Sequence, residues 1–258
     1  MKSEYKPGLK RDVDKDLVNS LNDTGKIKLT IDGYDLVSSD WDKTRQNFWP
    51  ELIDEIKKYI PKRDSSLNTK ILDLGCGNGR LIDEIEKLNN LDYKLEYFGI
   101  DPSKELIKIA IEKHKEKLSH ENINYKLESF DGLSLNNILD KENINLEDER
   151  FDQVISIAVL HHIPPSKVVD WLKEANRVTK KDTVSIFTTW NLNESNYDLN
   201  ENKDAVIGFV HHKNTRYVHY YDYAEIRNIF NLSGYSILEI KEIKRESGMS
   251  NTVIIAQK

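Results

Sequence analysis

Residues 70–80, KILDLGCGNGR, place three glycines at alternate positions directly after an apolar run. This pattern predicts a buried strand that ends in a tight turn, because glycine accepts positive φ and lets the backbone approach a ligand closely. Helical spacing resumes at Leu81, so a helix N-terminus would point at that ligand. The spacing is not the Gly-x-Gly-x-x-Gly of dinucleotide folds, and an acid, Asp73, precedes the glycines. The stretch therefore predicts a nucleotide-like, cationic ligand without a pyrophosphate.

Composition narrows the class of protein further. With 38 basic and 44 acidic residues the net charge is -6, which does not indicate non-specific affinity for nucleic acid. The sequence contains no apolar run long enough to span a bilayer and starts without a hydrophobic signal core, so we expect a cytoplasmic protein that does not bind a membrane. A single cysteine, Cys76, excludes an internal disulfide framework and a thiolate-rich zinc site, and we expect no metal site.

Strand and helix patterns alternate through most of the chain. We expect five strands, at residues 70–74, 93–100, 123–127, 151–158 and 183–189, with helices at 80–88, 104–118 and 166–178 between them. A helix at 223–232 and two adjoining strands at 235–243 and 250–256 follow. The fold class is therefore α/β: a Rossmann-like, seven-stranded, mostly parallel sheet with helices on both faces and an antiparallel C-terminal edge hairpin.

Two segments lie outside this alternation. Residues 1–33 are polar, and we expect an N-terminal extension, followed by one domain over residues 34–258. Within that domain, apolar residues at helical spacing predict a helical flap over residues 34–62, where Pro50 can open a second helix. The polar stretch at residues 191–215 predicts an insertion.

Acidic residues follow several of the predicted strands. Asp101 ends the second strand, where its carboxylate can accept both hydroxyl protons of a ribose. Asp131 could accept from an exocyclic amine, and Asp73 could balance a cationic amino group. Other interpretations stay open, because Asp101-Pro102-Ser103 can cap the next helix and Asp131-Gly132 can form only a turn. Cys76 can simply pack beneath the glycine turn.

The same motifs resemble those of the class I S-adenosylmethionine-dependent methyltransferases. LDLGCGNG, at residues 72–79, resembles their first motif, GIDPS their second and FDQVISI their fourth, although residues 178–183 lack the usual Pro-Gly-Gly. The resemblance implies S-adenosylmethionine as the cofactor. It implies these cofactor-binding residues: Asp73, Gly75, Cys76, Gly77, Asn78, Asp101, Pro102, Asp131, Gly132, Ile157 and Ala158.

A narrower resemblance covers three flanking segments. Residues 34–50 (YDLVSSDWDKTRQNFWP), 156–162 (SIAVLHH) and 216–221 (RYVHYY) are similar to the methyltransferases that esterify 5-carboxymethyluridine at the tRNA wobble position. This resemblance implies tRNA as a partner and a small zinc-containing protein as an activator. It implies Arg45 as a catalytic residue, and the residues that it implies for substrate binding are Tyr34, Trp49, His162, Arg216, Tyr217 and His219.

The nucleophile decides what the site must supply. A carboxylate has a pKa of about 4 and is already ionised at neutral pH. It needs only orientation, for which a guanidinium is suited; Arg45 is our first candidate and Arg216 the second. A phenol or amine would need a base, for which His161, His162 or His219 are candidates, and we name His161 with Arg45 as catalytic.

Alternatives remain open at this point. One alternative is a small-molecule methyltransferase with His161 or His162 as the base, and another is a non-catalytic cofactor-binding subunit. His161 directly follows an apolar strand, where histidines are often structural, and Tyr34, Trp49 and Tyr217 can equally be core residues.

Overall fold

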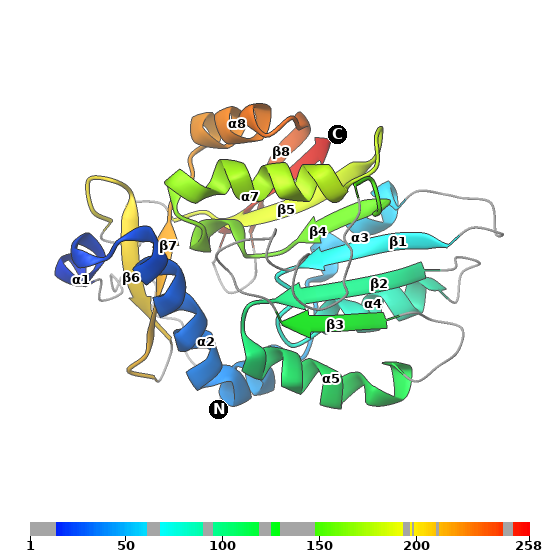
Figure 1. Cartoon of the computed structure of the whole chain (residues 1–258), viewed down its shortest axis with the longest axis horizontal. Coiled ribbons are helices and arrows are strands. Elements are labelled where there is room, and N and C mark those ends of the chain that lie inside the picture. The colour runs from blue at the N-terminus through cyan, green and yellow to red at the C-terminus, as the bar shows by residue number, and fades with distance from the viewer. Residues whose placement is uncertain are drawn as a thin grey trace.

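The computed structural model describes residues 14–60, 68–89, 95–118, 125–129, 148–192, 197, 199–209, 212–244 and 250–258. Its main sheet has seven strands in the order β3-β2-β1-β4-β5-β9-β8 (Figure 1). The strands are β1 (Thr69–Leu74), β2 (Leu95–Asp101), β3 (Tyr125–Ser129), β4 (Gln153–Ser156), β5 (Val184–Trp190), β8 (Ser236–Lys244) and β9 (Ser250–Gln257). The first five pair in parallel, and β9 is antiparallel to both β5 and β8. The predicted Rossmann-like sheet with its edge hairpin is confirmed.

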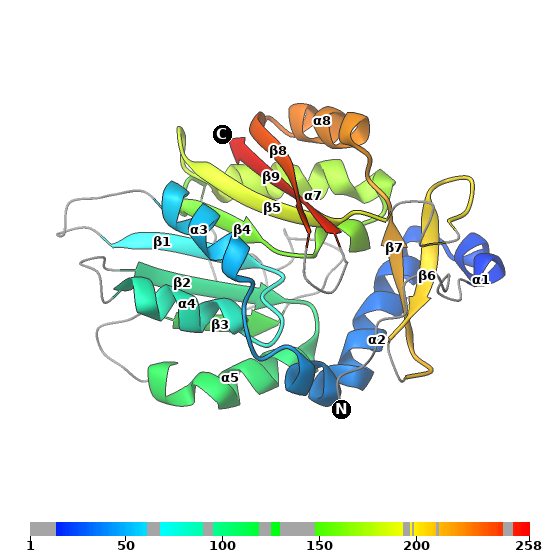
Figure 2. The same cartoon turned by 180° about the vertical axis from the view of Figure 1, so that it is seen from behind.

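Helices cover both faces of this sheet, as Figures 1 and 2 show. One face packs against α3 (Pro50–Tyr59), α4 (Arg80–Asn89) and α5 (Lys104–Leu118), and the other against α7 (Pro165–Val178) and α8 (Tyr223–Leu232). Alternate strand residues face opposite sides, so Ile71 belongs to the first layer and Leu72 to the second. None of the helices in the described ranges combines the length and apolar character needed to cross a membrane.

The N-terminal region differs from our prediction. After α1 (Lys15–Ser20), helix α2 (Asp23–Thr44) continues unbroken through residue 33, where we placed the boundary between extension and domain. That boundary is therefore corrected. The buried face of α2 consists of Ile27, Thr30, Gly33 and Val37, of which only Ile27 and Val37 are large and apolar. The helical periodicity is consequently weak in the sequence.

The insertion predicted at residues 191–215 contains an antiparallel ribbon of two strands, β6 (Asp204–Gly208) and β7 (Thr215–His219). Because β7 ends at His219, the insertion extends beyond residue 215, where we predicted its end. The ribbon packs along α2, where the backbone N–H of Tyr217 donates to Thr30 Oγ1 at 3.1 Å. A Cβ on Gly33 would lie 2.4 Å from the Thr215 carbonyl oxygen, so only glycine permits this approach.

We expect Gly33→Ala to loosen the packing between α2 and the ribbon. Alanine favours the helix by about 1 kcal/mol, but the backbone clash cannot be relieved by a rotamer change and should exceed that gain. The expected net destabilisation is about 1–2 kcal/mol in urea unfolding. Gly208→Ala is the control, because its Cβ would meet nothing nearer than Asn214 O at 4.0 Å. Equal stability of the two variants would contradict this packing.

Candidate active site

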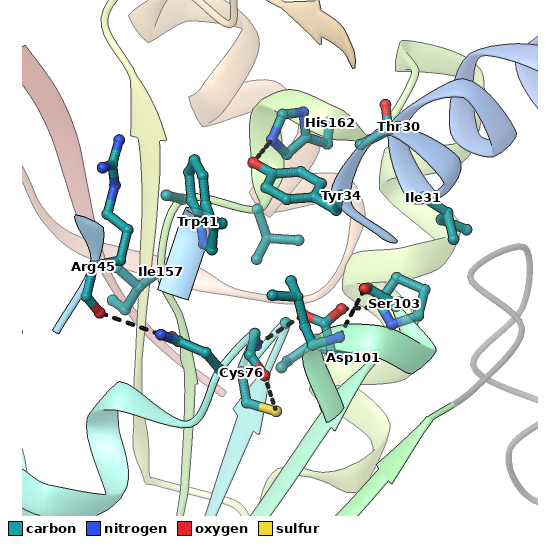
Figure 3. Close-up of a pocket in the computed structure, with 18 of the residues that line it drawn as sticks. Thr30, Ile31, Tyr34, Trp41, Arg45, Cys76, Asp101, Ser103, Ile157 and His162 are labelled. Carbon is teal, nitrogen blue, oxygen red and sulfur yellow. Dashed lines mark hydrogen bonds between the residues drawn. The ribbon is translucent and has the colours of Figure 1, made fainter. Parts of the chain in front are cut away.

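A cavity lies at the carboxyl ends of β1, β2, β4 and β5, under α2, and encloses about 1200 Å³ together with its open mouth (Figure 3). Ligands of open α/β sheets bind at this edge. The cavity wall contains twelve of the residues singled out from the sequence: Tyr34, Arg45, Trp49, Gly75, Cys76, Gly77, Asn78, Asp101, Pro102, Ile157, Ala158 and His162.

Other predicted site residues lie elsewhere. Five of them, Asp73, His161, Arg216, Tyr217 and His219, do not line the cavity. Asp131 and Gly132 fall outside the described residues, so their predicted roles stay predictions.

The glycine turn has the backbone that its sequence predicts. Gly75, Gly77 and Gly79 have φ values of 86°, 56° and 77°. The N–H groups of Gly75 and Cys76 both donate to Ile100 O, at 2.8 and 3.1 Å, which fixes the turn against the end of β2. A Cβ on Gly75 would lie 2.2 Å from Val159 Cγ2. The turn therefore leaves its backbone exposed to the cavity, as a closely bound ligand needs.

Asp101 ends β2 and lines the cavity. Its Oδ2 accepts from Gly77 N at 2.9 Å and its Oδ1 from Ser103 N at 2.8 Å, so it orders both the turn and the entry to α5. Burial raises the pKa of Asp101 to about 6, against these two hydrogen bonds, which lower it. Each oxygen has a further lone pair for a hydroxyl donor. The arrangement fits a nucleoside cofactor and also satisfies the helix-capping interpretation.

We expect Asp101→Asn to weaken binding of S-adenosylhomocysteine about tenfold to a hundredfold at pH 8, because charge-assisted hydrogen bonds are lost. In the wild type, affinity should fall as pH drops through about 6, since protonated Asp101 loses acceptor capacity. The variant should lack that pH dependence. Calorimetry at pH 8 and pH 5 measures both effects, and equal affinities for the two proteins would refute the assignment.

Asp73 lies beneath the turn rather than in the cavity wall. It accepts from Tyr97 Oη at 2.6 Å, and burial raises the pKa of its carboxyl to about 7. Its carboxyl is thus only partly ionised at neutral pH in this environment. Asp73 connects β1 to β2 behind the cavity wall, and its influence on a cationic ligand would be electrostatic.

The two adjacent histidines follow β4 in a short 3₁₀ turn, η1 (Leu160–His162). His162 donates from Nδ1 to Tyr217 O at 2.7 Å, and its Nε2 lies 3.0 Å from Tyr34 Oη. His161 accepts from Trp190 N through Nδ1 at 3.3 Å and stacks on the Trp190 ring. Burial lowers the pKa of His162 to about 3 and the pKa of His161 well below its usual value. Both imidazoles are therefore neutral and weakly basic.

Two arginines contribute to the site, one at the end of α2 and one on the ribbon. Arg45 lines the cavity at the end of α2, with its guanidinium 4.4 Å from the centre of the Trp41 ring and hydrogen-bonded to Thr44 (Figure 3). Arg216 is buried on β7 against the rings of Phe209 and Trp190, at 4.1 and 5.0 Å. Its positive charge contributes to the lowered pKa values of His161 and His162. Arg216 therefore places a positive charge beside the two histidines on the ribbon side of the cavity.

Tyr217 and His219 belong to a buried network around Asp204. The Asp204 carboxylate accepts from Tyr217 Oη, His219 Nδ1 and Lys26 Nζ, each at 2.7 Å. These bonds hold the pKa of Asp204 below its usual value, although burial opposes them. The network joins the ribbon to α2. Both side chains thus support the site through the ribbon and do not face the cavity.

Helix α2 is fixed to the cofactor side of the cavity as well. Asn78 of the glycine turn donates to Asp42 Oδ1 at 2.8 Å and to Arg45 O at 3.2 Å. Near the start of α5, Ser103 Oγ donates to Asp35 Oδ1 at 2.5 Å. One helix consequently touches the cofactor turn, the β2 end and the ribbon.

Our sequence reasoning missed several residues of the wall. They are Ile27, Thr30, Ile31, Trp41, Leu74, Arg80, Ser103, Leu106, Val159, Ile163, Trp171 and Trp190. Trp190 follows the fifth predicted strand and so stands at a candidate position, although we assigned it no role in the site. Ile27, Thr30 and Ile31, from the first half of α2, gave no sign of a site in the sequence, because we interpreted that segment as a polar extension.

Comparisons with known proteins agree with this geometry. A family model described as a methyltransferase domain matches residues 65–234, more than half of the chain. The ubiquinone biosynthesis O-methyltransferase of Pelagibacter ubique is 26% identical over 193 residues, which cover 70% of each chain. The tRNA (carboxymethyluridine(34)-5-O)-methyltransferase of Arabidopsis thaliana is 28% identical over 158 residues, which are 61% of this chain and 31% of that protein.

Solved structures share the fold. A SAM-dependent methyltransferase from Methanosarcina mazei superposes with a TM-score of 0.59 at 20% identity, covering 82% of this chain and 98% of that one. Magnesium protoporphyrin IX methyltransferase from Synechocystis, crystallised with SAH, gives a TM-score of 0.61 at 15% identity and covers 90% and 99%. At these identities the likeness concerns the fold alone.

Proposed function

We infer that this chain, which belongs to the methyltransferase-domain family, is an S-adenosylmethionine-dependent methyltransferase. The cofactor supplies a methyl group on a sulfonium. We propose that the acceptor is an already ionised carboxylate, and that the reaction forms a methyl ester. The acceptor we propose is the carboxymethyl group of a tRNA wobble uridine.

The observation that carries this proposal is the hydrogen bonding and the low basicity of His161 and His162. Each imidazole beside the cavity uses a ring nitrogen in a hydrogen bond to the protein, and burial lowers both pKa values. A group with a pKa of about 3 removes no proton from a phenol or an amine at neutral pH. A carboxylate needs no such base. The site is therefore better suited to an ionised oxygen nucleophile.

Arg45 is the proposed orienting residue. It lines the cavity, and a guanidinium can hold a carboxylate by two parallel hydrogen bonds. Arg216 adds positive charge from the ribbon, which favours an anionic substrate without direct contact. Methyl transfer is an in-line displacement, so these groups act by aligning the acceptor and by favouring its ionised form.

A tRNA substrate is supported by two observations. The Arabidopsis relative is a tRNA carboxymethyluridine methyltransferase, and the segments at residues 34–50 and 216–221 both lie beside the cavity through Tyr34, Arg45 and Arg216. Trp41, Trp49 and Trp190 provide aromatic walls for a base. Because the net charge is -6, we propose that a small zinc-containing partner supplies basic surface for the RNA.

A second candidate is a small-molecule O-methyltransferase. The cavity wall includes the apolar residues Ile27, Ile31, Ile163 and Trp171, and one relative acts in ubiquinone biosynthesis. This apolar lining favours an acceptor with a hydrophobic part. A neutral phenol would still lack a base among the described histidines of the site.

Label transfer from S-adenosylmethionine tests the proposal. We expect the purified chain, with a small zinc-containing partner present, to label unfractionated tRNA and not the small molecules of a protein-free extract. Labelling of an extract metabolite alone would favour the second candidate. Cofactor binding without transfer to either pool would indicate a non-catalytic subunit.

A further inference from the structure

A directed hydrogen-bond chain runs from the ribbon into the cavity. Tyr217 O is a carbonyl oxygen and can only accept, so His162 Nδ1, 2.7 Å away, must carry a proton. The ring is neutral in this buried position, which leaves Nε2 as an acceptor. The Tyr34 hydroxyl, 3.0 Å from Nε2, must therefore be the donor, as Figure 3 illustrates.

The Tyr34 ring is held in this orientation. It packs edge to face against Trp41 and Phe209, with centroids 5.1 Å apart in both cases, and against His162 at 5.5 Å. Burial raises the pKa of Tyr34, so the hydroxyl stays protonated. Its single proton is committed to His162. Within the described part of the chain no group donates to Tyr34 Oη, so its lone pairs are available as acceptors at the cavity wall.

An acceptor at this place has a chemical consequence. A carboxylate oxygen next to Tyr34 Oη would meet a second acceptor, which is unfavourable, whereas an N–H group would find a partner. We propose that Tyr34 is a specificity-determining residue that accepts a hydrogen bond from a ring N–H of the methyl acceptor, such as the imide N–H of a pyrimidine-2,4-dione. This inference rests on the proposed function, because it assumes that the acceptor's carboxylate lies by Arg45.

The donor comes from the methyl acceptor rather than from the cofactor. The cofactor elements, the glycine turn and Asp101, follow β1 and β2. The partners that fix the Tyr34 hydroxyl, His162 and Tyr217, follow β4 and lie on the ribbon. The Tyr34 hydroxyl is therefore oriented by groups that follow β4 and lie on the ribbon.

Two nucleosides test this inference. The first is 5-carboxymethyluridine, and the second is its 3-N-methyl derivative, which lacks the imide N–H. Binding is followed by tryptophan fluorescence with saturating S-adenosylhomocysteine, in the wild type, Tyr34→Phe and Tyr223→Phe. Tyr223 is half exposed on α8 and outside the cavity wall, so its variant is the matched control.

We expect the wild type and Tyr223→Phe to bind 5-carboxymethyluridine about tenfold more tightly than the N-methyl derivative, which corresponds to one hydrogen bond. A methyl group also adds bulk, so the decisive quantity is the difference between proteins. Tyr34→Phe should bind 5-carboxymethyluridine about tenfold more weakly and lose most of the discrimination. Its affinity for S-adenosylhomocysteine should be unchanged.

Three results would overturn the inference: no discrimination by the wild type, equal discrimination by Tyr34→Phe, or a loss of S-adenosylhomocysteine affinity in that variant. The first is decisive even if Tyr34→Phe fails to fold. The test is separate from that of the proposed function. A chain that discriminates between the nucleosides but esterifies no tRNA would retain this recognition and lose the proposed activity.

Discussion

Gly75→Ala is expected to abolish measurable binding of S-adenosylhomocysteine, with a loss of at least about a hundredfold. The new Cβ would lie 2.2 Å from Val159 Cγ2, and φ at this position is 86°. A side chain in that backbone region adds about 1 kcal/mol of strain, and the clash displaces either the turn or the loop after β4. Both line the cavity, so calorimetry with the folded variant should detect the loss.

A double variant separates the clash with Val159 from the backbone strain of positive φ. Val159→Ala removes the atom that clashes, so Gly75→Ala/Val159→Ala should recover part of the affinity and keep only the strain of positive φ. Gly208→Ala serves again as the control, because its added methyl group has open space. If Gly75→Ala binds S-adenosylhomocysteine as tightly as the wild type does, the cofactor does not lie against this turn.

Arg45→Ala should have the second large effect, a fall of about a hundredfold in the methyl-transfer rate, because a bidentate charge-assisted contact to the carboxylate is lost. Arg45→Lys should recover only part of it, since an ammonium cannot form the two-pronged contact. Cofactor affinity should change little, because the hydrogen bond from Asn78 of the glycine turn to Arg45 is accepted by the backbone oxygen, which the substitution keeps. Single-turnover assays and calorimetry measure the two quantities.

Arg227→Ala is the matched control for charge, since Arg227 is exposed on α8 and is not part of the cavity wall. It should leave the transfer rate unchanged. Should Arg45→Ala transfer methyl groups at the wild-type rate, the carboxylate is oriented by a group other than Arg45.

The sheet and its cofactor edge could be predicted because they depend on local patterns. Apolar strands, the glycine turn and Asp101 each leave a signal within a few residues, and parallel alternation then brings their ends together. This is why Gly75, Gly77 and Asp101 were found together in the cavity wall.

The substrate side was harder because it is built by long-range packing. Helix α2 buries a face that includes Thr30 and Gly33, and its position depends on the ribbon, whose contacts are far away in sequence. Hydrogen-bond networks likewise leave no periodic signal. Tyr217 and His219 therefore read as candidates for substrate contact, whereas their side chains are bonded to Asp204.

The central claim is that the site methylates an oxygen that is ionised before it binds. The most direct measurement is the chemical stability and the pH dependence of the product formed on tRNA from labelled S-adenosylmethionine. We predict a label released by mild alkali, as a methyl ester requires, and a single-turnover rate that is constant between about pH 6.5 and 9, since a carboxylate is ionised throughout this range. An alkali-stable label, or a rate that rises with pH across that range, would contradict the claim.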